Sequence, residues 1–323
     1  MPEAPAPITR LAILDDYQGV AMSMGPWERL KGVEVTVFRD TLTDADALAA
    51  RLAPFDAILA MRERTPFPRA LIERLPKLRL LITTAARNRS IDAAACAERG
   101  IVFCGTPSHG DPTVDITWGL IIGLMRDLPA QERALREGRW QTSVGTALEG
   151  RTLGVVGLGK LGGRVAKVAH AFGMKVIAWS QNLTEARAAE VGATRVDKAA
   201  LFQQADVVTL HLILSDRSRG IVGAADLARM KPSAFVVNTS RGPLIDQDTL
   251  IAALRNGRIA GAGIDVFDIE PLPAGHPILA APNTLLTPHL GYVSQQNYRA
   301  YYAGCVEAIE AFDAGAPVRV IAP

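Results

Sequence analysis

The segment Gly157-Leu158-Gly159-Lys160-Leu161-Gly162 constrains the fold of this chain more than any other. It directly follows the apolar run Leu153–Val156 and opens an amphipathic stretch, Leu161–Phe172. Glycines at 157 and 159 permit a tight turn and let backbone N–H groups approach a pyrophosphate, while Gly162 lets the helix pack closely on the strand. Because a strand precedes the glycines and a helix follows them, the segment predicts a dinucleotide-binding βαβ unit. Its predicted coenzyme contacts are Gly157, Gly159, Lys160, Leu161 and Gly162.

The end of the next predicted strand, Lys175–Trp179, bears on the choice of coenzyme. An Asp or Glu about 20 residues after the glycines normally binds the adenosine ribose hydroxyls of NAD. Here the strand is followed by Ser180-Gln181-Asn182. No carboxylate repels a 2′-phosphate at Ser180, and neither Ser180 nor Gln181 supplies a cation that would select one. Arg187 lies further along and could reach this position, although the pattern favours a solvated charge on a helix. The sequence therefore predicts NAD or NADP, with Ser180 at the ribose.

Short apolar runs alternate with amphipathic stretches in two successive series. This pattern predicts right-handed βαβ crossovers, parallel sheets and hence an α/β fold, the second series being a doubly wound domain. Between the series we predict a longer helix from Thr113 to about Arg126, ended by Pro129. The strands of the first series are predicted at Ile8–Leu14, Val33–Phe38, Ala57–Ala60, Leu78–Ile82 and Ile101–Phe103. Those of the second are predicted at Leu153–Val156, Lys175–Trp179, Asp206–Leu210, Ala234–Asn238, Gly261–Ile264 and Thr284–Thr287.

Length and charge exclude several classes of protein. A chain of 323 residues is long enough for two domains. A formal net charge of +2, with scattered basic residues, argues against nucleic acid or a membrane surface as a partner. No stretch reaches the roughly 20 consecutive apolar residues that a membrane span needs. Three widely spaced cysteines indicate reduced thiols in a cytoplasmic protein, and we predict no metal site.

Three polar residues follow predicted strands of the second series. Arg241 comes after Ala234–Asn238, Glu270 after Gly261–Ile264 and His289 after Thr284–Thr287. The carboxyl ends of the strands in an open α/β sheet form the ligand crevice. Each residue alone is equally consistent with a surface charge or a cap. Together they predict a catalytic site at one rim of the sheet.

The segments around these residues also carry a family resemblance. They are Thr239-Ser240-Arg241-Gly242-Pro243-Leu244-Ile245-Asp246, Asp265-Val266-Phe267-x-x-Glu270-Pro271 and Thr287-Pro288-His289-Leu290-Gly291. They closely resemble the signatures of the D-isomer-specific 2-hydroxyacid dehydrogenases, which include phosphoglycerate, glycerate, hydroxypyruvate and D-lactate dehydrogenases. The resemblance covers nearly the whole chain. It implies a Rossmann-like dinucleotide-binding domain at 107–292, a discontinuous flavodoxin-like substrate domain at 8–106 plus 293–323, and a homodimer.

The resemblance further implies hydride transfer between NAD or NADP and a small 2-oxo or 2-hydroxy acid. Arg241 would bind the substrate carboxylate and keto oxygen, and His289 would exchange a proton with that oxygen. Glu270 would fix the tautomer of His289 and favour its charged form. Further coenzyme contacts would be His211, Thr239, Ser240, Asp265 (at the nicotinamide end) and Gly291. Substrate contacts would be Arg62, Ala85, Ala86 and Arg87, where Arg87 either selects a second anionic group or is an ion-paired surface residue.

Two other functions are compatible with parts of this pattern. A dinucleotide-sensing binding protein, like the transcriptional corepressors related to the family, can keep all three catalytic residues. A formate dehydrogenase has an amide where the histidine's acidic partner stands, so Glu270 argues against that reading. The individual acid, the coenzyme preference and the physiological direction are left open by the sequence.

Overall fold

The computed structural model describes residues 6–323, which fold into two compact units. One unit holds the described residues up to Gly110 together with Ser294–Pro323, and the other holds Asp111–Val293. The domain boundaries expected from the sequence lie at 106/107 and 292/293. Each unit has its own parallel sheet.

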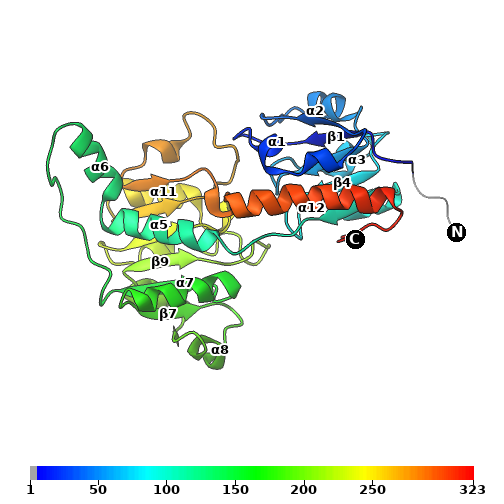
Figure 1. Cartoon of the computed structure of the whole chain (residues 1–323). Coiled ribbons are helices and arrows are strands. Elements are labelled where there is room, and N and C mark those ends of the chain that lie inside the picture. Colours follow the sequence, from blue (N-terminus) through cyan, green and yellow to red (C-terminus); the bar gives the residue numbers. More distant parts are fainter. Residues whose placement is uncertain (1–5) are drawn as a thin grey trace. The chain divides into compact units, whose positions relative to one another are not determined.

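The first unit is built on a five-stranded parallel sheet (Figure 1) with the strand order β2-β1-β3-β4-β5. This is the flavodoxin-like order, so the predicted fold of this unit is confirmed. The central strands β3 and β4 are buried along their whole length, as expected where helices cover both faces. The strands are β1 (Arg10–Ile13), β2 (Glu34–Val37), β3 (Ala57–Ala60), β4 (Leu80–Thr83) and β5 (Val102–Gly105). The helices are α1 (Ala21–Met24), α2 (Ala45–Leu52), α3 (Arg69–Ile72), α4 (Ala93–Glu98) and the C-terminal α12 (Gln295–Asp313).

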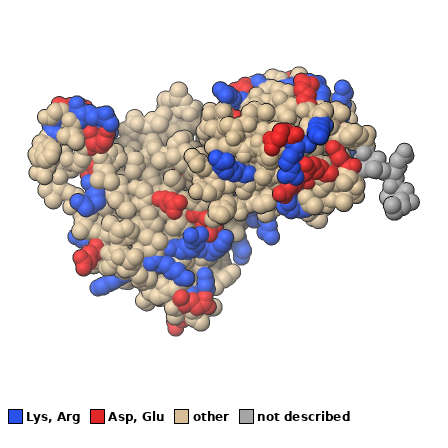
Figure 2. All heavy atoms as spheres, viewed as in Figure 1, with Lys and Arg blue, Asp and Glu red and all other residues tan. Residues whose placement is uncertain are grey.

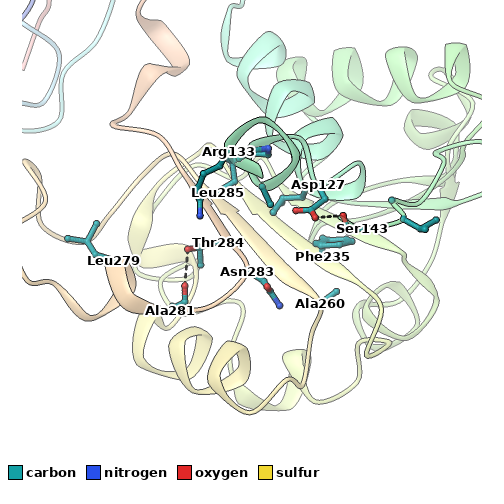
Figure 3. A pocket seen from close by; sticks show the side chains of 15 residues that line it. Asp127, Arg133, Ser143, Phe235, Ala260, Leu279, Ala281, Asn283, Thr284 and Leu285 are labelled. Atoms are coloured by element: carbon teal, nitrogen blue, oxygen red, sulfur yellow. Dashed lines mark hydrogen bonds between the residues drawn. The ribbon is translucent and has the colours of Figure 1, made fainter. Parts of the chain in front are cut away.

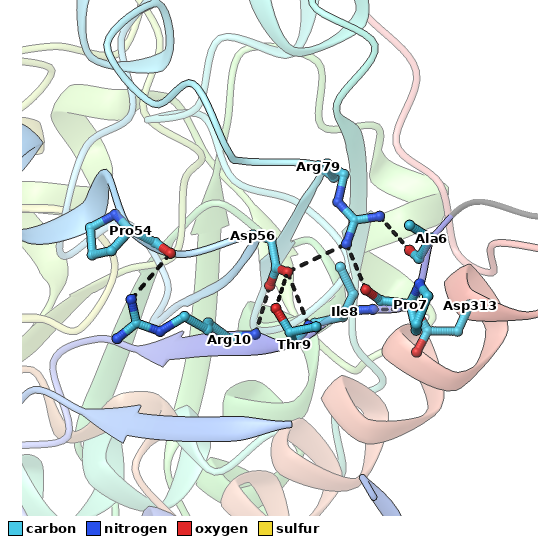
Figure 4. A network of polar contacts seen from close by, with 9 residues as sticks. All are labelled: Ala6, Pro7, Ile8, Thr9, Arg10, Pro54, Asp56, Arg79 and Asp313. Carbon is cyan, nitrogen blue, oxygen red and sulfur yellow. Dashed lines mark hydrogen bonds and ion pairs between the residues drawn. The ribbon is translucent and has the colours of Figure 1, made fainter. Parts of the chain in front are cut away.

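A polar network fixes the entry of the chain into this sheet (Figure 4). Asp56, just before β3, accepts hydrogen bonds from the N–H groups of Thr9 at 3.0 Å and Arg10 at 2.8 Å. Burial alone would raise the pKa of Asp56, but these bonds hold it below its ordinary value. Arg79 donates to the carbonyl oxygen of Pro7 at 2.8 Å. The start of β1 is thereby tied to the start of β3.

The second unit is built on a seven-stranded parallel sheet with the order β12-β11-β10-β9-β6-β7-β8. This is the Rossmann order with one further strand, β12, beside β11, and it confirms the predicted doubly wound fold. Figure 1 shows α5 and α7 side by side on one face, over a core that includes Trp118 and Val165. A second core, which includes Leu201 and Leu250, fills the other face. The strands are β6 (Thr152–Val156), β7 (Lys175–Trp179), β8 (Thr194–Arg195), β9 (Val207–Leu210), β10 (Phe235–Asn238), β11 (Gly261–Ile264) and β12 (Thr284–Leu286). The helices are α5 (Thr113–Met125), α6 (Leu128–Arg136), α7 (Lys160–Ala171), α8 (Glu185–Ala189), α9 (Lys198–Gln204), α10 (Ala224–Leu227) and α11 (Gln247–Arg255).

The interpretation of Pro129 needs correction. Helix α5 ends at Met125, and Pro129 lies in the first turn of a new helix, α6. Proline is tolerated there because the first N–H groups of a helix have no intrahelical partner. Asp127, with a left-handed φ of +54°, makes the break between the two helices.

The charged side chains are mixed in sign over the face seen in Figure 2, with acidic and basic groups next to each other over both units. Between residues 6 and 323, no helix combines the length and the apolar character needed to cross a bilayer.

Candidate active site

The dinucleotide fingerprint forms the turn between β6 and α7. Gly157 has a φ of +99°, and a Cβ there would lie 2.7 Å from the carbonyl oxygen of His211. A Cβ on Gly162 would lie 2.2 Å from the carbonyl oxygen of Gly157. The chain itself therefore requires both glycines, the first for its left-handed backbone and the second for the packing of α7 on the turn.

Gly159 differs from these two glycines. Its φ of −80° suits other residues, and apart from the glycine itself and its two chain neighbours no atom of the described chain lies within 4 Å of the position that a Cβ would take. The residue directly precedes α7. The first N–H groups of a helix have no partner within it, so this end of α7 carries a positive potential. Open space at this end of a 12-residue helix fits the pyrophosphate of a dinucleotide.

Lys160 and Leu161, the next two residues, point to different environments. The Lys160 ammonium lies 3.1 Å from one carboxylate oxygen of Asp111, and Arg164 donates to the other oxygen at 2.5 Å. Burial alone would raise the pKa of Asp111, but these partners hold it below its ordinary value. The Lys160 side chain is still 79% exposed, so its charge lies in solvent beside the start of α7. Leu161 is half-buried against the core.

Ser180 and His211 directly follow β7 and β9, the two neighbours of β6 in the sheet. The point where the strand order reverses lies between β6 and β9, and ligands of doubly wound sheets bind there. The His211 Nε2 lies 2.9 Å from the hydroxyl oxygen of Thr209. Burial lowers the pKa of His211 to about 4. His211 is therefore a neutral group at pH 7 beside the fingerprint.

Gly242 brings the loops after β10 and β11 together. A Cβ on Gly242 would lie 2.2 Å from the carbonyl carbon of Phe267, so only glycine permits this contact. Arg241, its neighbour, accepts a hydrogen bond at its carbonyl oxygen from Asn238 Nδ2 at 2.8 Å. The Arg241 guanidinium donates to the carbonyl oxygen of Ser240 at 2.7 Å. The loop that carries Arg241 is thus fixed against the loop that leads to Glu270.

Glu270 and His289 form a direct pair. The His289 Nδ1 lies 2.6 Å from Oε2 of Glu270, whose other oxygen accepts the N–H of Phe267 at 2.8 Å. Both side chains are only 18% exposed. His289 has a left-handed φ of +54°, a conformation that costs about 1 kcal/mol or more and persists where surrounding contacts impose it. Because Nδ1 faces Glu270, Nε2 is the nitrogen left for a substrate oxygen.

Asp265 holds the segment that carries His289. Its Oδ1 accepts hydrogen bonds from the Thr287 hydroxyl at 2.6 Å and the Leu290 N–H at 2.7 Å, and its Oδ2 accepts the Gly291 N–H at 2.9 Å. Burial raises the pKa of Asp265, and these bonds and the nearby His289 oppose the shift. Both carboxylate oxygens therefore bind the chain itself around the predicted catalytic histidine.

Thr239 and Ser240 are fixed in a similar way. The Thr239 hydroxyl lies 2.8 Å from that of Thr117 on α5, and the Ser240 hydroxyl donates to the carbonyl oxygen of Leu212 at 2.6 Å. The supporting roles of Thr117, Asn238 and Thr287 were not predicted from the sequence. Short polar residues are common at strand ends, and only the fold shows which loop each one holds.

The predicted substrate residues of the first unit lie in two adjacent loops. Arg62 follows β3 and Ala85–Arg87 follow β4, its neighbour in the sheet. Asn88 joins the loops, because its Nδ2 donates to Thr83 Oγ1 at 3.0 Å and to the carbonyl oxygen of Arg62. Arg62 and Ala85 both have left-handed backbones, with φ of +52° and +66°. The N–H of Ala85 donates to Thr106 Oγ1 at 2.9 Å, whereas the Arg87 side chain is exposed.

A pocket of about 590 Å³ opens at the amino ends of the strands in the second unit (Figure 3). Phe235 and Thr284, the first residues of β10 and β12, line it together with Arg133 and Val144. Arg241, Glu270 and His289 follow the opposite ends of the same sheet, so this pocket is separate from them. Across residues 6–323, no group of three or more His, Cys, Asp or Glu side chains could hold a metal ion.

Comparison with known proteins identifies the family. A family model described as the NAD binding domain of D-isomer specific 2-hydroxyacid dehydrogenases matches residues 118–291. A hydroxypyruvate reductase from Blautia hydrogenotrophica is 30% identical over 325 residues, 97% of this chain and 99% of the relative. A glyoxylate reductase from Korarchaeum cryptofilum is 34% identical over 287 residues, 86% of this chain and 83% of the relative. The crystal structure of a phosphoglycerate oxidoreductase from Vibrio cholerae O395 superposes with a TM-score of 0.91 at 38% identity, covering 96% of this chain and 100% of that one. The chain therefore belongs to the D-isomer-specific 2-hydroxyacid dehydrogenase family, as an NAD- or NADP-dependent oxidoreductase that acts on the CH–OH group of 2-hydroxy acids and on the corresponding 2-oxo acids.

Proposed function

We propose that His289, Glu270 and Arg241 carry out the reaction, and the 2.6 Å contact between His289 Nδ1 and Glu270 Oε2 is the observation that carries this proposal. Reduced nicotinamide, when bound, supplies a hydride to the carbonyl carbon of a 2-oxo acid. His289 donates a proton from Nε2 to the carbonyl oxygen, and Glu270 stabilises the charged imidazole before the transfer. In the opposite direction, neutral His289 accepts the hydroxyl proton. Arg241 presents a planar guanidinium to the substrate carboxylate and keto oxygen.

The remaining site residues divide between coenzyme and substrate. We assign the coenzyme phosphates to the turn at Gly157–Gly162, with the Lys160 charge beside it, and the nicotinamide half to the edge near His211, Thr239, Ser240 and Gly291. Asp265 serves this half indirectly, because its oxygens hold the backbone of Leu290 and Gly291. In the first unit, Arg62 and the N–H groups of Ala86 and Arg87 bind the substrate. Ala85 fixes that loop, since its own N–H is bound to Thr106.

A panel of 2-oxo acids tests the proposal. Glyoxylate, hydroxypyruvate, pyruvate and longer 2-oxo acids are each supplied with NADH and NADPH, and oxidation is followed at the nicotinamide absorbance. At least one acid should turn over. His289→Gln should lower kcat by about 10²–10⁴-fold with an unchanged dissociation constant for the coenzyme. His170→Gln is the control, because His170 contacts the carbonyl oxygen of Val191 on the flank of the same unit. If a dinucleotide binds but no acid turns over, the chain is a dinucleotide sensor instead.

We also propose a homodimer that forms through α6 and the segment after it. Four large apolar side chains in this region are exposed: Leu128 by 50%, Leu135 by 58%, Trp140 by 75% and Val144 completely. Clustered exposed apolar groups are typical of interaction surfaces. Trp140→Glu should convert a dimer to a monomer in sedimentation velocity, and a wild-type protein that sediments as a monomer would refute the proposal.

A cytoplasmic location is proposed from the state of the cysteines. Cys96, Cys104 and Cys305 are all free and buried. Free thiols persist in a reducing compartment. Fractionation of the source cells tests this proposal.

A further inference from the structure

The loop after β7 lacks the carboxylate that distinguishes NAD from NADP. Residues 180–184 are Ser-Gln-Asn-Leu-Thr, so hydroxyl and amide groups stand where a carboxylate would repel a 2′-phosphate. The loop is well anchored, because Arg195 Nε donates to the carbonyl oxygen of Leu183 at 2.8 Å. Thr184 caps α8 by accepting the N–H of Arg187 at 3.2 Å. The position of Arg187 is therefore set by the same loop.

The Arg187 guanidinium reaches back to the first turn of α7. A Cβ on Gly163 would lie 3.4 Å from Arg187 Nη2 and 3.5 Å from Val191, so this flank of α7 faces α8. Another part of α7 contacts α5, and Lys160 and Arg164 are paired with Asp111, which lies two residues before the start of α5. Since β7 lies beside β6 on the side away from β9, the α8 flank is the side of the adenosine ribose, and the predicted catalytic residues follow strands on the other side.

Within residues 6–323, the Arg187 guanidinium has one ion-pair partner, and that pair is exposed. Arg187 contacts Glu190 one turn later on the surface, where the two side chains are 42% and 59% exposed. Exposed pairs of this kind contribute little and exchange readily. A phosphate dianion offers the planar guanidinium several acceptors and more charge than one carboxylate does. Arg187 can therefore leave Glu190 for a phosphate without the loss of a strong contact.

From these contacts we infer that the chain prefers a phosphorylated adenosine ribose, and hence NADP to NAD, and that Arg187 with Ser180 binds the 2′-phosphate. The inference rests on the proposed coenzyme site at the first turn of α7. Arg187 then determines the coenzyme specificity, because the neutral loop at 180–184 carries no negative charge that would repel the 2′-phosphate.

Binding of nucleotide fragments tests the inference without any substrate. Isothermal titration of the full chain with 2′,5′-ADP and with 5′-AMP should give tighter binding of 2′,5′-ADP. Arg187→Ala should weaken 2′,5′-ADP by about tenfold or more, as expected for a charge-assisted contact, and should leave 5′-AMP within about twofold. NADPH and NADH, followed by nicotinamide fluorescence, should show the same difference. Equal binding of the two fragments to the wild-type chain would overturn the inference.

Two further variants guard against a general loss of structure. Glu190→Gln removes the competing carboxylate and leaves Arg187 in place, so it should strengthen 2′,5′-ADP by about twofold to threefold; a weakening would contradict the assignment. Arg29→Ala removes a comparable exposed pair with Glu310 in the first unit and should change neither affinity. Turnover of a 2-oxo acid with equal fragment affinities would refute only this inference. Preferred binding of 2′,5′-ADP without any turnover would refute only the proposed function.

Discussion

Substitutions at Gly159 and Gly162 should distinguish an effect on dinucleotide binding from an effect on the packing and stability of the fold. Gly162→Ala places a Cβ 2.2 Å from a backbone oxygen, about 1 Å too close, so α7 must move away from the turn. Overpacking of this kind costs about 1–3 kcal/mol of unfolding free energy. Beyond its two chain neighbours, the new Cβ of Gly159→Ala meets no atom of the described chain within 4 Å, and the residue has an ordinary φ. Its effect on stability should stay within about 1 kcal/mol, because the loss of unfolded-state entropy offsets a weaker N-cap.

Coenzyme binding should be weakened strongly by Gly159→Ala, the substitution that changes stability less. The Cβ at Gly159 would occupy the space in front of the first N–H groups of α7, so dinucleotide affinity should fall by about 10–100-fold, or about 1.4–2.7 kcal/mol. Urea denaturation measures the stability of each variant, and fluorescence titration with NADPH and NADH measures its affinity. The expected pattern is a stable Gly159→Ala that binds poorly and a destabilised Gly162→Ala. Wild-type affinity in a stable Gly159→Ala would show that the pyrophosphate does not approach this turn and would refute the prediction.

Three further predictions concern the carboxylates and His211. Glu270→Gln should lower kcat by about tenfold to a hundredfold with little change in coenzyme affinity, because the amide cannot stabilise a charged His289 as the carboxylate does; stopped-flow single turnovers would measure this, and an unchanged rate would remove Glu270 from the mechanism. Asp265→Ala should reduce both kcat and the protection of the Leu290 and Gly291 amides in hydrogen exchange, since it removes their acceptor; full protection would contradict the holding role. For His211, the folded pKa of about 4 lies below the ordinary value of 6.5, so the unfolded chain takes up the proton first and stability is lost as the pH falls through this window. The loss should be about 2 kcal/mol between about pH 7.5 and pH 5, and His211→Asn should lack it in urea denaturation at the two pH values.

Much of the fold could be predicted because the strands are short, apolar and regularly separated. The bounds of β3, β7 and β11 are those expected from their apolar runs. Strand β8 was not predicted, because Thr194–Arg195 is too short and too polar to show a hydrophobic pattern typical of a strand. Helix α6 was missed for another reason. Proline lacks an N–H, so it is compatible both with the end of one helix and with the first turn of the next. The left-handed backbone of Asp127 marks the break that places Pro129 in a second helix.

The two carboxylates after β11 show why the sequence could locate the candidate site but could not assign separate roles to its residues. Asp265 and Glu270 belong to one motif, and each was expected to touch a bound molecule or the catalytic imidazole. In the fold, Asp265 is fully buried and accepts three hydrogen bonds from the segment Thr287–Gly291. Glu270 uses one oxygen for the Phe267 N–H and turns the other toward His289 Nδ1. The first acid therefore sets where the histidine stands, and the second sets which of its nitrogens faces outward. Spacing along the chain cannot separate these roles, because both depend on the order β12-β11-β10 in the sheet, which brings the ends of three distant segments to one edge.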